Sequence, residues 1–201
     1  MREINPKDVF DSAISDHLKI VQGLTRQQDL LETIARAMAG SLRKGDKVLW
    51  CGNGGSAADS QHLAAEIVGR FRRERRGLPS IALTTDSSIL TAVANDYGYQ
   101  CVFSRQVEAI AKPGDILVGL STSGNSENVL MAIDRARSMG VTTVAFTGRE
   151  GGKIGKVADH VLMIGSTDTA RIQEAHILAG HMICDWIEIE WLQSPARDSS
   201  T

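Results

Sequence analysis

Five short apolar runs alternate with helix-length segments, and this alternation constrains the fold more than any other feature of the chain. The runs cover residues 47–51, 81–83, 116–120, 143–146 and 161–164, and each is followed by small or turn-forming residues. Strands that are apolar on both faces and alternate with helices are typical of a parallel sheet covered on both sides. The sequence therefore predicts a three-layer α/β domain.

Helical periodicity dominates both ends of the chain. Residues 8–42 predict two helices, or one helix bent at Gly23, and residues 169–192 predict a long, unusually apolar helix that we expect to be buried in a subunit contact. Further helices are expected at 56–69, 87–95, 103–111 and 127–139, with a short one at 151–158. We expect a single domain: a helical extension at 1–45, an α/β core with its C-terminal helix at 46–193, and a flexible tail at 194–201.

Charge and hydropathy exclude several classes of function. The chain has 22 Lys and Arg against 24 Asp and Glu, a net charge of −2, so neither nucleic acid nor an anionic membrane is an expected partner. The basic run at 70–76 is expected to be a solvated loop. No apolar stretch approaches the ~18 residues of a spanning helix, and residues 1–6 do not begin a signal peptide, so we expect a cytoplasmic protein. Cys51 and Cys184 are expected to be small buried hydrophobes.

Two loops after predicted strands carry the residues of an anion site. Residues 52–58 read Gly-Asn-Gly-Gly-Ser-Ala-Ala and residues 121–128 read Ser-Thr-Ser-Gly-Asn-Ser-Glu-Asn, and each opens into a helix. Ligands of open parallel sheets bind outside the carboxyl ends of the strands, where helix N-termini favour anions. The glycines alone would also suit a tight turn, and Ser126 could simply cap its helix. Because no Lys follows the first loop, a sugar phosphate fits better than a nucleotide.

Ionisable side chains interrupt two of the predicted helices. His62 and Glu66 are four residues apart, so they share one helix face and can bind one metal ion, transfer protons to one substrate, or form an ordinary surface pair. Their neighbours are small or apolar, so we expect this face to be buried and Glu66 to suit the role of general base. Gln173 and His181 lie ~12 Å apart along the last helix and converge only toward something between them. His176 is expected to be structural.

One polar pair follows the helical segment after the second predicted strand. Asn95 and Asp96 can hold sugar hydroxyls or form an Asx turn before Gly98.

Taken together, these motifs resemble the phosphoheptose isomerases of the sugar isomerase (SIS) domain superfamily. The resemblance spans residues 49–189 and rests on motifs that occur in the family's order, among them Gly52-Asn53-Gly54-Gly55-Ser56, Gln61-His62-x-x-x-Glu66, Asn95-Asp96, Ser121-Thr122-Ser123-Gly124-Asn125-Ser126 and Arg171-Ile172-Gln173-Glu174-x-His176. It implies a five-stranded parallel α/β/α sandwich of flavodoxin or Rossmann type and a homotetramer with active sites between subunits. It also implies conversion of D-sedoheptulose 7-phosphate to D-glycero-D-manno-heptose 7-phosphate, for ADP-heptose and lipopolysaccharide core biosynthesis.

The resemblance also implies roles for individual residues. Glu66 would be the base and His181 the acid, and one Zn²⁺ per subunit would be held by His62, Glu66, Gln173 and His181. Substrate would be bound by Glu66 and Gln173, by Asn95 and Asp96 at its hydroxyls, and at its phosphate end by Asn53, Gly54, Gly55, Ser121, Thr122, Ser123 and Ser126.

Two other functions are compatible with the same fold. One is a non-catalytic SIS-domain protein that binds the replication initiator, and the other is a sugar-phosphate sensor. The presence of both Glu66 and His181 favours the enzyme.

Overall fold

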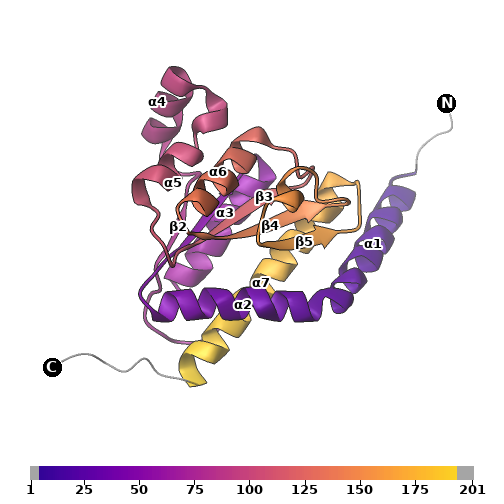
Figure 1. Ribbon diagram of the computed structural model, residues 1–201. Helices are drawn as coiled ribbons and strands as arrows, with labels where there is room; N and C mark the ends of the chain where they lie inside the picture. Colours follow the sequence, from indigo (N-terminus) through magenta and orange to yellow (C-terminus); the bar gives the residue numbers. More distant parts are fainter. Residues whose placement is uncertain (1–4, 194–201) are drawn as a thin grey trace.

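A five-stranded, all-parallel sheet forms the centre of the computed structural model (Figure 1). The structure describes residues 5–193, so the tail expected at 194–201 lies outside the described residues. The strands are β1 (Val48–Gly52), β2 (Ser80–Ala82), β3 (Ile116–Ser121), β4 (Thr142–Gly148) and β5 (His160–Ile164), in the order β2-β1-β3-β4-β5. This is the flavodoxin-like order of doubly wound sheets, and it confirms the predicted fold class.

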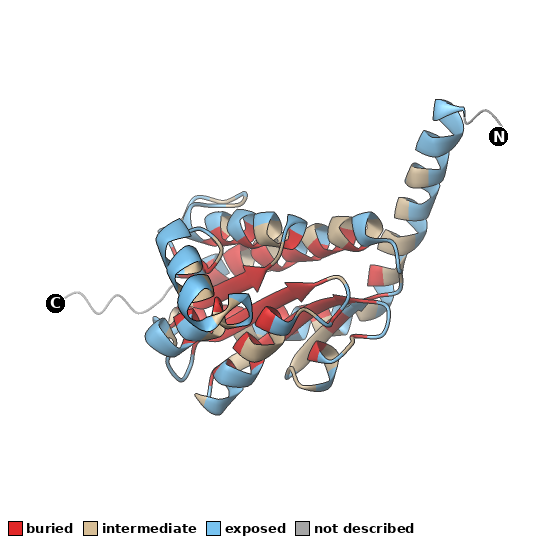
Figure 2. Ribbon diagram, turned by 90° about the horizontal axis from the view of Figure 1, so that it is seen from above, coloured by how far each residue is buried: buried red, intermediate tan, exposed pale blue. Residues whose placement is uncertain are grey.

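The strands are apolar throughout because both faces of the sheet are covered. Val48 and Trp50 of β1 belong to the core cluster on one face, whereas Leu49 and Cys51 belong to the cluster on the other. Successive side chains of a strand point to opposite faces, so a strand between two helical layers needs apolar residues at every position. Figure 2 shows the resulting band of buried strands between helices whose outer surfaces are exposed.

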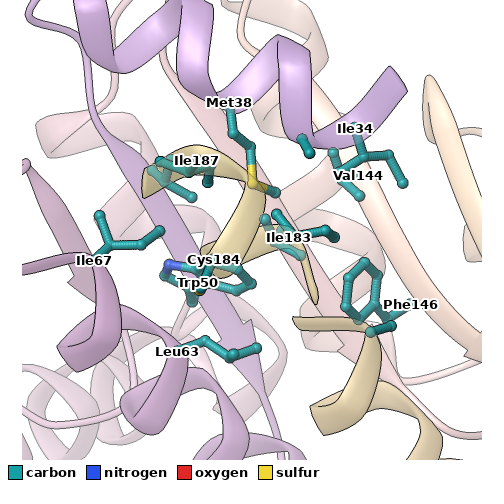
Figure 3. Close-up of a cluster of buried hydrophobic side chains, with 14 of the residues drawn as sticks. Ile34, Met38, Trp50, Leu63, Ile67, Val144, Phe146, Ile183, Cys184 and Ile187 are labelled. Carbon is teal, nitrogen blue, oxygen red and sulfur yellow. The ribbon is translucent and has the colours of Figure 1, made fainter. Parts of the chain in front are cut away.

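The first face of the sheet is covered by α2 (Gln28–Arg43), α3 (Gly55–Val68) and α7 (Thr169–Gln193). Met38 of α2, Leu63 of α3 and Ile183 of α7 meet over Trp50 in one cluster (Figure 3). Packing within the chain explains most of the apolar character of α7, and the subunit contact predicted for this helix stays a prediction. Most of its apolar side chains pack inside this chain, against the sheet, α2 and α3.

The second face is covered by α5 (Ser104–Ile110) and α6 (Glu127–Ser138), and α4 (Ser87–Tyr97) lies beyond them. A short 3₁₀ helix, η2 (Tyr99–Cys101), joins α4 to α5. The helix predicted at 151–158 is limited to the 3₁₀ turn η3 (Ile154–Lys156). Gly151 and Gly152 have φ values of +74° and +58°, so the chain cannot be α-helical there.

The N-terminal extension consists of two separate helices. α1 (Pro6–Gln22) projects from the body of the molecule (Figure 2), and the 3₁₀ segment η1 (Gly23–Gln27) joins it to α2. The break at Gly23 was one of the two predicted alternatives. His17 of α1 contacts Glu174 of α7, with Nδ1 2.7 Å from Oε2, so the last turns of α1 are tied to the body of the protein.

Two cysteines and one histidine are among the side chains buried in the core. Cys51 and Cys184 are free thiols, and burial raises the pKa of each to about 12, which confirms them as inert buried residues. His176 is fully buried, and its Nε2 lies 3.1 Å from the carbonyl oxygen of Thr147, which confirms the structural role predicted for it.

Burial of His176 should make the protein less stable as the pH falls. Desolvation lowers the pKa of this imidazole from 6.5 to about 4, against a smaller opposing effect of the Thr147 hydrogen bond. Between these two values the unfolded chain binds more protons than the folded protein, so stability is lost as the pH falls through that window. The difference corresponds to about 3 kcal/mol. Urea titrations of wild type and His176→Gln at pH 7 and pH 4 should show the smaller loss in the variant. Equal losses would contradict the assignment.

No helix in the described range 5–193 is long and apolar enough to span a bilayer.

Candidate active site

Two loops meet where the strand order of the sheet reverses. From the central strand β1 the chain moves outward to β2 and then returns to β3 on the other side of β1. The carboxyl ends of β1 and β3 therefore flank the position at which doubly wound sheets bind their ligands. The first loop consists of Asn53 and Gly54 and leads into α3, and the second spans residues 122–126 and leads into α6. The structure thus brings the two predicted anion-binding loops together.

Three serine hydroxyls, one at the end of β3 and two in the second loop, converge on one point. Ser121 Oγ lies 2.8 Å from Ser126 Oγ and 3.4 Å from Ser123 Oγ. Ser126 occupies the N-cap position of α6, but its hydroxyl makes no capping hydrogen bond. Hydroxyl groups gathered at a helix N-terminus are suited to bind phosphate oxygens. The alternative in which Ser126 merely caps the helix is therefore wrong.

The hydrogen bonds of the hydroxyl cluster join Ser121, Ser123 and Ser126 and do not include Thr122. Its carbonyl oxygen accepts from the backbone N–H of Gly148, which ties the second loop to the end of β4. With Ser123 it lines a polar cavity of about 320 Å³ that reaches Thr169 at the start of α7.

Asn128, to which the sequence assigned no role, connects the two loops. Its amide and that of Asn53 form a reciprocal pair: Asn53 Nδ2 donates to Asn128 Oδ1 at 2.9 Å, and Asn128 Nδ2 donates to Asn53 Oδ1 at 2.8 Å. Tyr99 adds a hydrogen bond from its hydroxyl to Asn53 Oδ1 at 3.3 Å. Asn128 is buried. The sequence signal for its role was an amide in the first turn of an otherwise apolar helix face, because a buried amide needs hydrogen-bond partners.

Gln173 of α7 lies directly over the first loop. A Cβ atom placed on Gly55 would stand 2.4 Å from Gln173 Nε2, so a side chain at this position would displace the amide. Gly55 begins α3, and Gly54 occupies its N-cap position. Asn53, Gly54, Gly55 and Gln173 therefore border one region, and the role of Gln173 as a substrate contact or metal ligand stays a prediction.

His62, Glu66 and His181 form a second cluster, between α3 and α7. His62 Nε2 lies 2.9 Å from His181 Nε2 and 3.2 Å from Glu66 Oε1. The two helices approach closely here because Gly180 has no side chain. A Cβ at that position would stand 2.5 Å from both methyl groups of Leu63. His62 precedes Leu63 in the sequence, and His181 follows Gly180. The packing of Leu63 on Gly180 therefore places the two histidines side by side.

This cluster is open to solvent on one side. The side chain of His62 is 50% exposed and that of Glu66 is 21% exposed, so the buried face predicted for this pair is wrong. Apolar neighbours at 63, 64 and 67 pack inward, but they leave the polar side chains at the rim of α3. Burial and the neighbouring His62 lower the pKa of His181, and Glu66 opposes this shift. The neutral imidazole is therefore favoured near pH 7.

The donor atoms of the cluster suit a transition metal ion. One ligand atom from each of the three residues lies within 4.8 Å of the others. Two imidazole nitrogens and one carboxylate oxygen are ligands that Zn²⁺ accepts, and three protein ligands leave a position free for water or substrate. Two Nε2 atoms that face each other also need either a shared proton or a cation between them.

Asn95 and Asp96 lie in the last turn of α4. Both are exposed, and Asn95 Nδ2 donates to Asp96 Oδ1 at 2.8 Å. The Asx turn considered for them is wrong, because α4 continues to Tyr97. α4 packs mainly against η2, so a role of the pair in holding sugar hydroxyls stays a prediction.

The basic run at 70–76 is more than the solvated loop predicted for it. Arg72 and Arg73 form ion pairs with Asp185 of α7, and the side chain of Arg75 is only 2% exposed. Phe71 stacks on His181 with ring centroids 5.1 Å apart and an interplanar angle of 21°. This contact was not predicted, because its only signal in the sequence is a single aromatic residue inside a basic segment.

Comparison with known proteins gives consistent matches over most of the chain. The family model described as SIS domain matches residues 13–148. A phosphoheptose isomerase of Aquifex aeolicus is 50% identical over 182 residues, which cover 90% of this chain and 94% of that protein. A solved phosphoheptose isomerase of Neisseria gonorrhoeae is 42% identical with a TM-score of 0.87, and one of Francisella tularensis is 35% identical with a TM-score of 0.89. Each structural match covers 92% of this chain and 100% of the other.

Proposed function

The chain belongs to the phosphoheptose isomerases of the SIS-domain family, and we propose on this basis that it converts D-sedoheptulose 7-phosphate to D-glycero-D-manno-heptose 7-phosphate. The reaction makes the heptose phosphate from which ADP-heptose for lipopolysaccharide core or other surface glycans is built. The observation that carries the proposal is the meeting of Glu66 and His181 in one cluster, in a fold that also gathers three serine hydroxyls at the carboxyl end of β3. A coupled assay with purified protein and sedoheptulose 7-phosphate tests it, and absence of heptose 7-phosphate would refute it.

Isomerisation of a ketose to an aldose moves a proton from C1 to C2 through an enediol. It needs a base at the carbons and an acid at the oxygens, and Glu66 and His181 are assigned to these roles. Glu66 directs Oε1 toward His62, at 3.2 Å, which leaves Oε2 to accept the substrate proton. This division of the carboxylate allows one residue to serve both as ligand and as base.

The proposed site has a phosphate end at the serine loop and a reacting end at Glu66 and His181. Gln173, above the first loop, and His181 lie eight residues apart on α7, about 12 Å along its axis, so their side chains converge only on a group that lies between them. A sugar whose phosphate is bound by Ser121, Ser123 and Ser126 can therefore extend along α7 and present C1 and C2 to Glu66. Thr122 and the Asn95–Asp96 pair remain proposed contacts of the sugar hydroxyls.

We assign one Zn²⁺ per subunit to His62, Glu66 and His181, with Gln173 as the proposed fourth ligand. When bound, the ion polarises the sugar oxygens and stabilises the charge that develops on them.

Metal binding should be measurable apart from activity. Zn²⁺ added to chelator-treated protein at about 100 times its Kd should stabilise the fold by ~2.7 kcal/mol and raise Tm by about 5–10 °C. The shift should be absent in His62→Ala and retained in His160→Ala, which alters an imidazole at the start of β5, at the opposite end of the sheet. An unchanged shift in His62→Ala would rule out the assigned ligand set.

Binding of substrate should depend on its phosphate. Sedoheptulose 7-phosphate should protect wild type against thermal unfolding, whereas unphosphorylated sedoheptulose should not, because the serine loop binds the anion. Ser121→Ala should weaken the protection. Ser138→Ala removes a hydroxyl that only bonds to its own helix, at Arg135, and should leave the protection unchanged. Equal protection by both sugars would remove the phosphate-loop assignment.

A homotetramer with active sites between subunits is the proposed assembly. α1 has an apolar stripe in which Phe10, Ile14 and Leu18 follow one another at intervals of four residues and each is more than half exposed. Leu178 and Met182 of α7 are also partly exposed, although most of that helix is buried in the chain. Exposed apolar stripes of this kind mark contact surfaces between proteins. A single domain over the whole chain and a cytoplasmic location complete the proposal.

The non-catalytic alternatives have weaker support. A binding module or sugar-phosphate sensor has no need of an acid and a base placed close together. Relatives that are about 50% identical to this chain are also named as isomerases.

A further inference from the structure

Glu188 lies at the centre of a polar cluster that the proposed mechanism does not use. The side chain of Glu188 is fully buried, with 0% exposure, although it carries a charge. It follows His181 by seven residues on α7, or about two helical turns, so both side chains leave the helix on the same side. A buried charge of this kind needs several partners to be tolerated.

The partners of Glu188 come from the segment at 70–76. Oε1 accepts from the backbone N–H of Phe71 at 2.7 Å, and Oε2 accepts from Arg72 and Arg73 at 2.9 and 2.8 Å. Burial by itself would raise the pKa of Glu188, but these three donors and Arg75 hold it below its usual range. The carboxylate is therefore anionic, and it fastens this segment to α7.

Arg75 extends the same connection to α3. Its Nε lies 3.3 Å from Glu188 Oε1, and its side chain is 2% exposed. Nη2 donates to the carbonyl oxygen of Glu66, and Nη1 donates to those of Ile67 and Gly69, all at 2.8 or 2.9 Å. The last carbonyls of a helix have no partner within it, so Arg75 caps α3 directly at the residue that bears the base.

We call Glu188, Arg75 and the backbone of residues 71–73 the clamp. Phe71 connects this clamp to His181, the proposed acid. Its backbone is held by Glu188, and its ring stacks on the imidazole of His181. The aromatic face thus forms a fixed wall on one side of His181.

We propose that Glu188 and Arg75 are positioning residues of the isomerase: their ion pair joins the end of α3 to α7 and seats Phe71 against His181, so that Glu66 and His181 are held at the separation that proton transfer requires. The inference rests on the proposed function for its kinetic consequence. Arg75 bonds to Glu66 at its backbone carbonyl and not at the carboxylate that we assign to the reaction.

Glu188→Gln tests the clamp with little change in volume. Misplacing a reacting group by a fraction of an ångström to 1 Å lowers turnover strongly, so kcat should fall by about 10- to 100-fold. KM should stay within about threefold, because the phosphate loops are untouched. Glu190→Gln is the matched control: it lies on the same helix, pairs with Arg43 of α2, and should keep the wild-type kcat. A wild-type kcat in folded Glu188→Gln would overturn the proposal.

Phe71→Leu covers the case in which loss of a buried charge prevents folding. It keeps an apolar side chain, and kcat should fall by about 3- to 10-fold with KM little changed. The ring of Phe71 should also shift the imidazole proton resonances of His181 in metal-free protein, and both variants should move them in the same direction. If wild type proves not to be an isomerase, the proposed function fails, while these resonances still decide the clamp. Resonances of His181 that do not move in Glu188→Gln would refute the clamp.

Discussion

Replacing Glu66 by Gln should lower turnover of sedoheptulose 7-phosphate by at least ~100-fold, because the amide cannot accept the proton from C1. The change keeps the size and hydrogen-bonding reach of the side chain, which lies at the rim of α3 and is 21% exposed. The fold should therefore be intact, as circular dichroism and the unfolding midpoint can verify. Steady-state kinetics should give a large fall in kcat and a small change in KM.

A matched control for this variant exists on α2. Glu32 forms an i,i+4 pair with Arg36 at 2.8 Å, as Glu66 does with His62, but it lies outside the site. Glu32→Gln should keep wild-type turnover. A Glu66→Gln protein that turns over as fast as this control would show that another group removes the proton.

Replacing His181 by Gln should cause a loss of similar size, at least ~100-fold, because the acid for the sugar oxygens is removed. The imidazole lies between His62 and Phe71, and its Nε2 is 2.9 Å from that of His62. Its loss should also weaken Zn²⁺ binding, whereas Glu66→Gln retains one oxygen as a possible ligand.

His160→Gln provides the comparison for His181. It makes the same substitution at the first residue of β5, at the end of the sheet opposite the two loops. Normal turnover in His160→Gln and a loss in His181→Gln are expected from kinetics at saturating substrate. Near-normal turnover in His181→Gln would leave the acid unassigned.

The strands and the break at Gly23 could be predicted because their signals are local. Each strand is a short run with apolar residues on both faces, and such runs have few other stable environments. The helix expected at 151–158 failed for a local reason as well, since two glycines there adopt left-handed backbone conformations that a helical pattern does not reveal. The apolar character of α7 could also be predicted from the sequence. The pattern of apolar residues does not show whether the same chain or another subunit covers the helix.

The candidate site was predictable only as far as its motifs extend. The serine loop, His62, Glu66 and His181 stand out in the sequence, and the structure brings the serines together and the other three together. The connections between motifs were not accessible. Asn53 and Asn128 lie 75 residues apart, and Arg72 and Glu188 lie 116 apart, so their hydrogen bonds depend on the completed fold.

The burial of Arg75 illustrates this limit. Arginine in a basic run is usually solvated, and only its partner on α7 and the free carbonyls at the end of α3 make burial favourable.

Isomerisation in D₂O tests most directly the claim that Glu66 and His181 together move a proton between C1 and C2 of a bound sugar phosphate. Proton transfer through an enediol lets the abstracted proton exchange with solvent, so the heptose 7-phosphate made by wild type should carry deuterium at C2, detectable by NMR. Glu66→Gln should form this labelled product at least ~100-fold more slowly. Product without deuterium, or labelled product formed by Glu66→Gln at the wild-type rate, would contradict the mechanism.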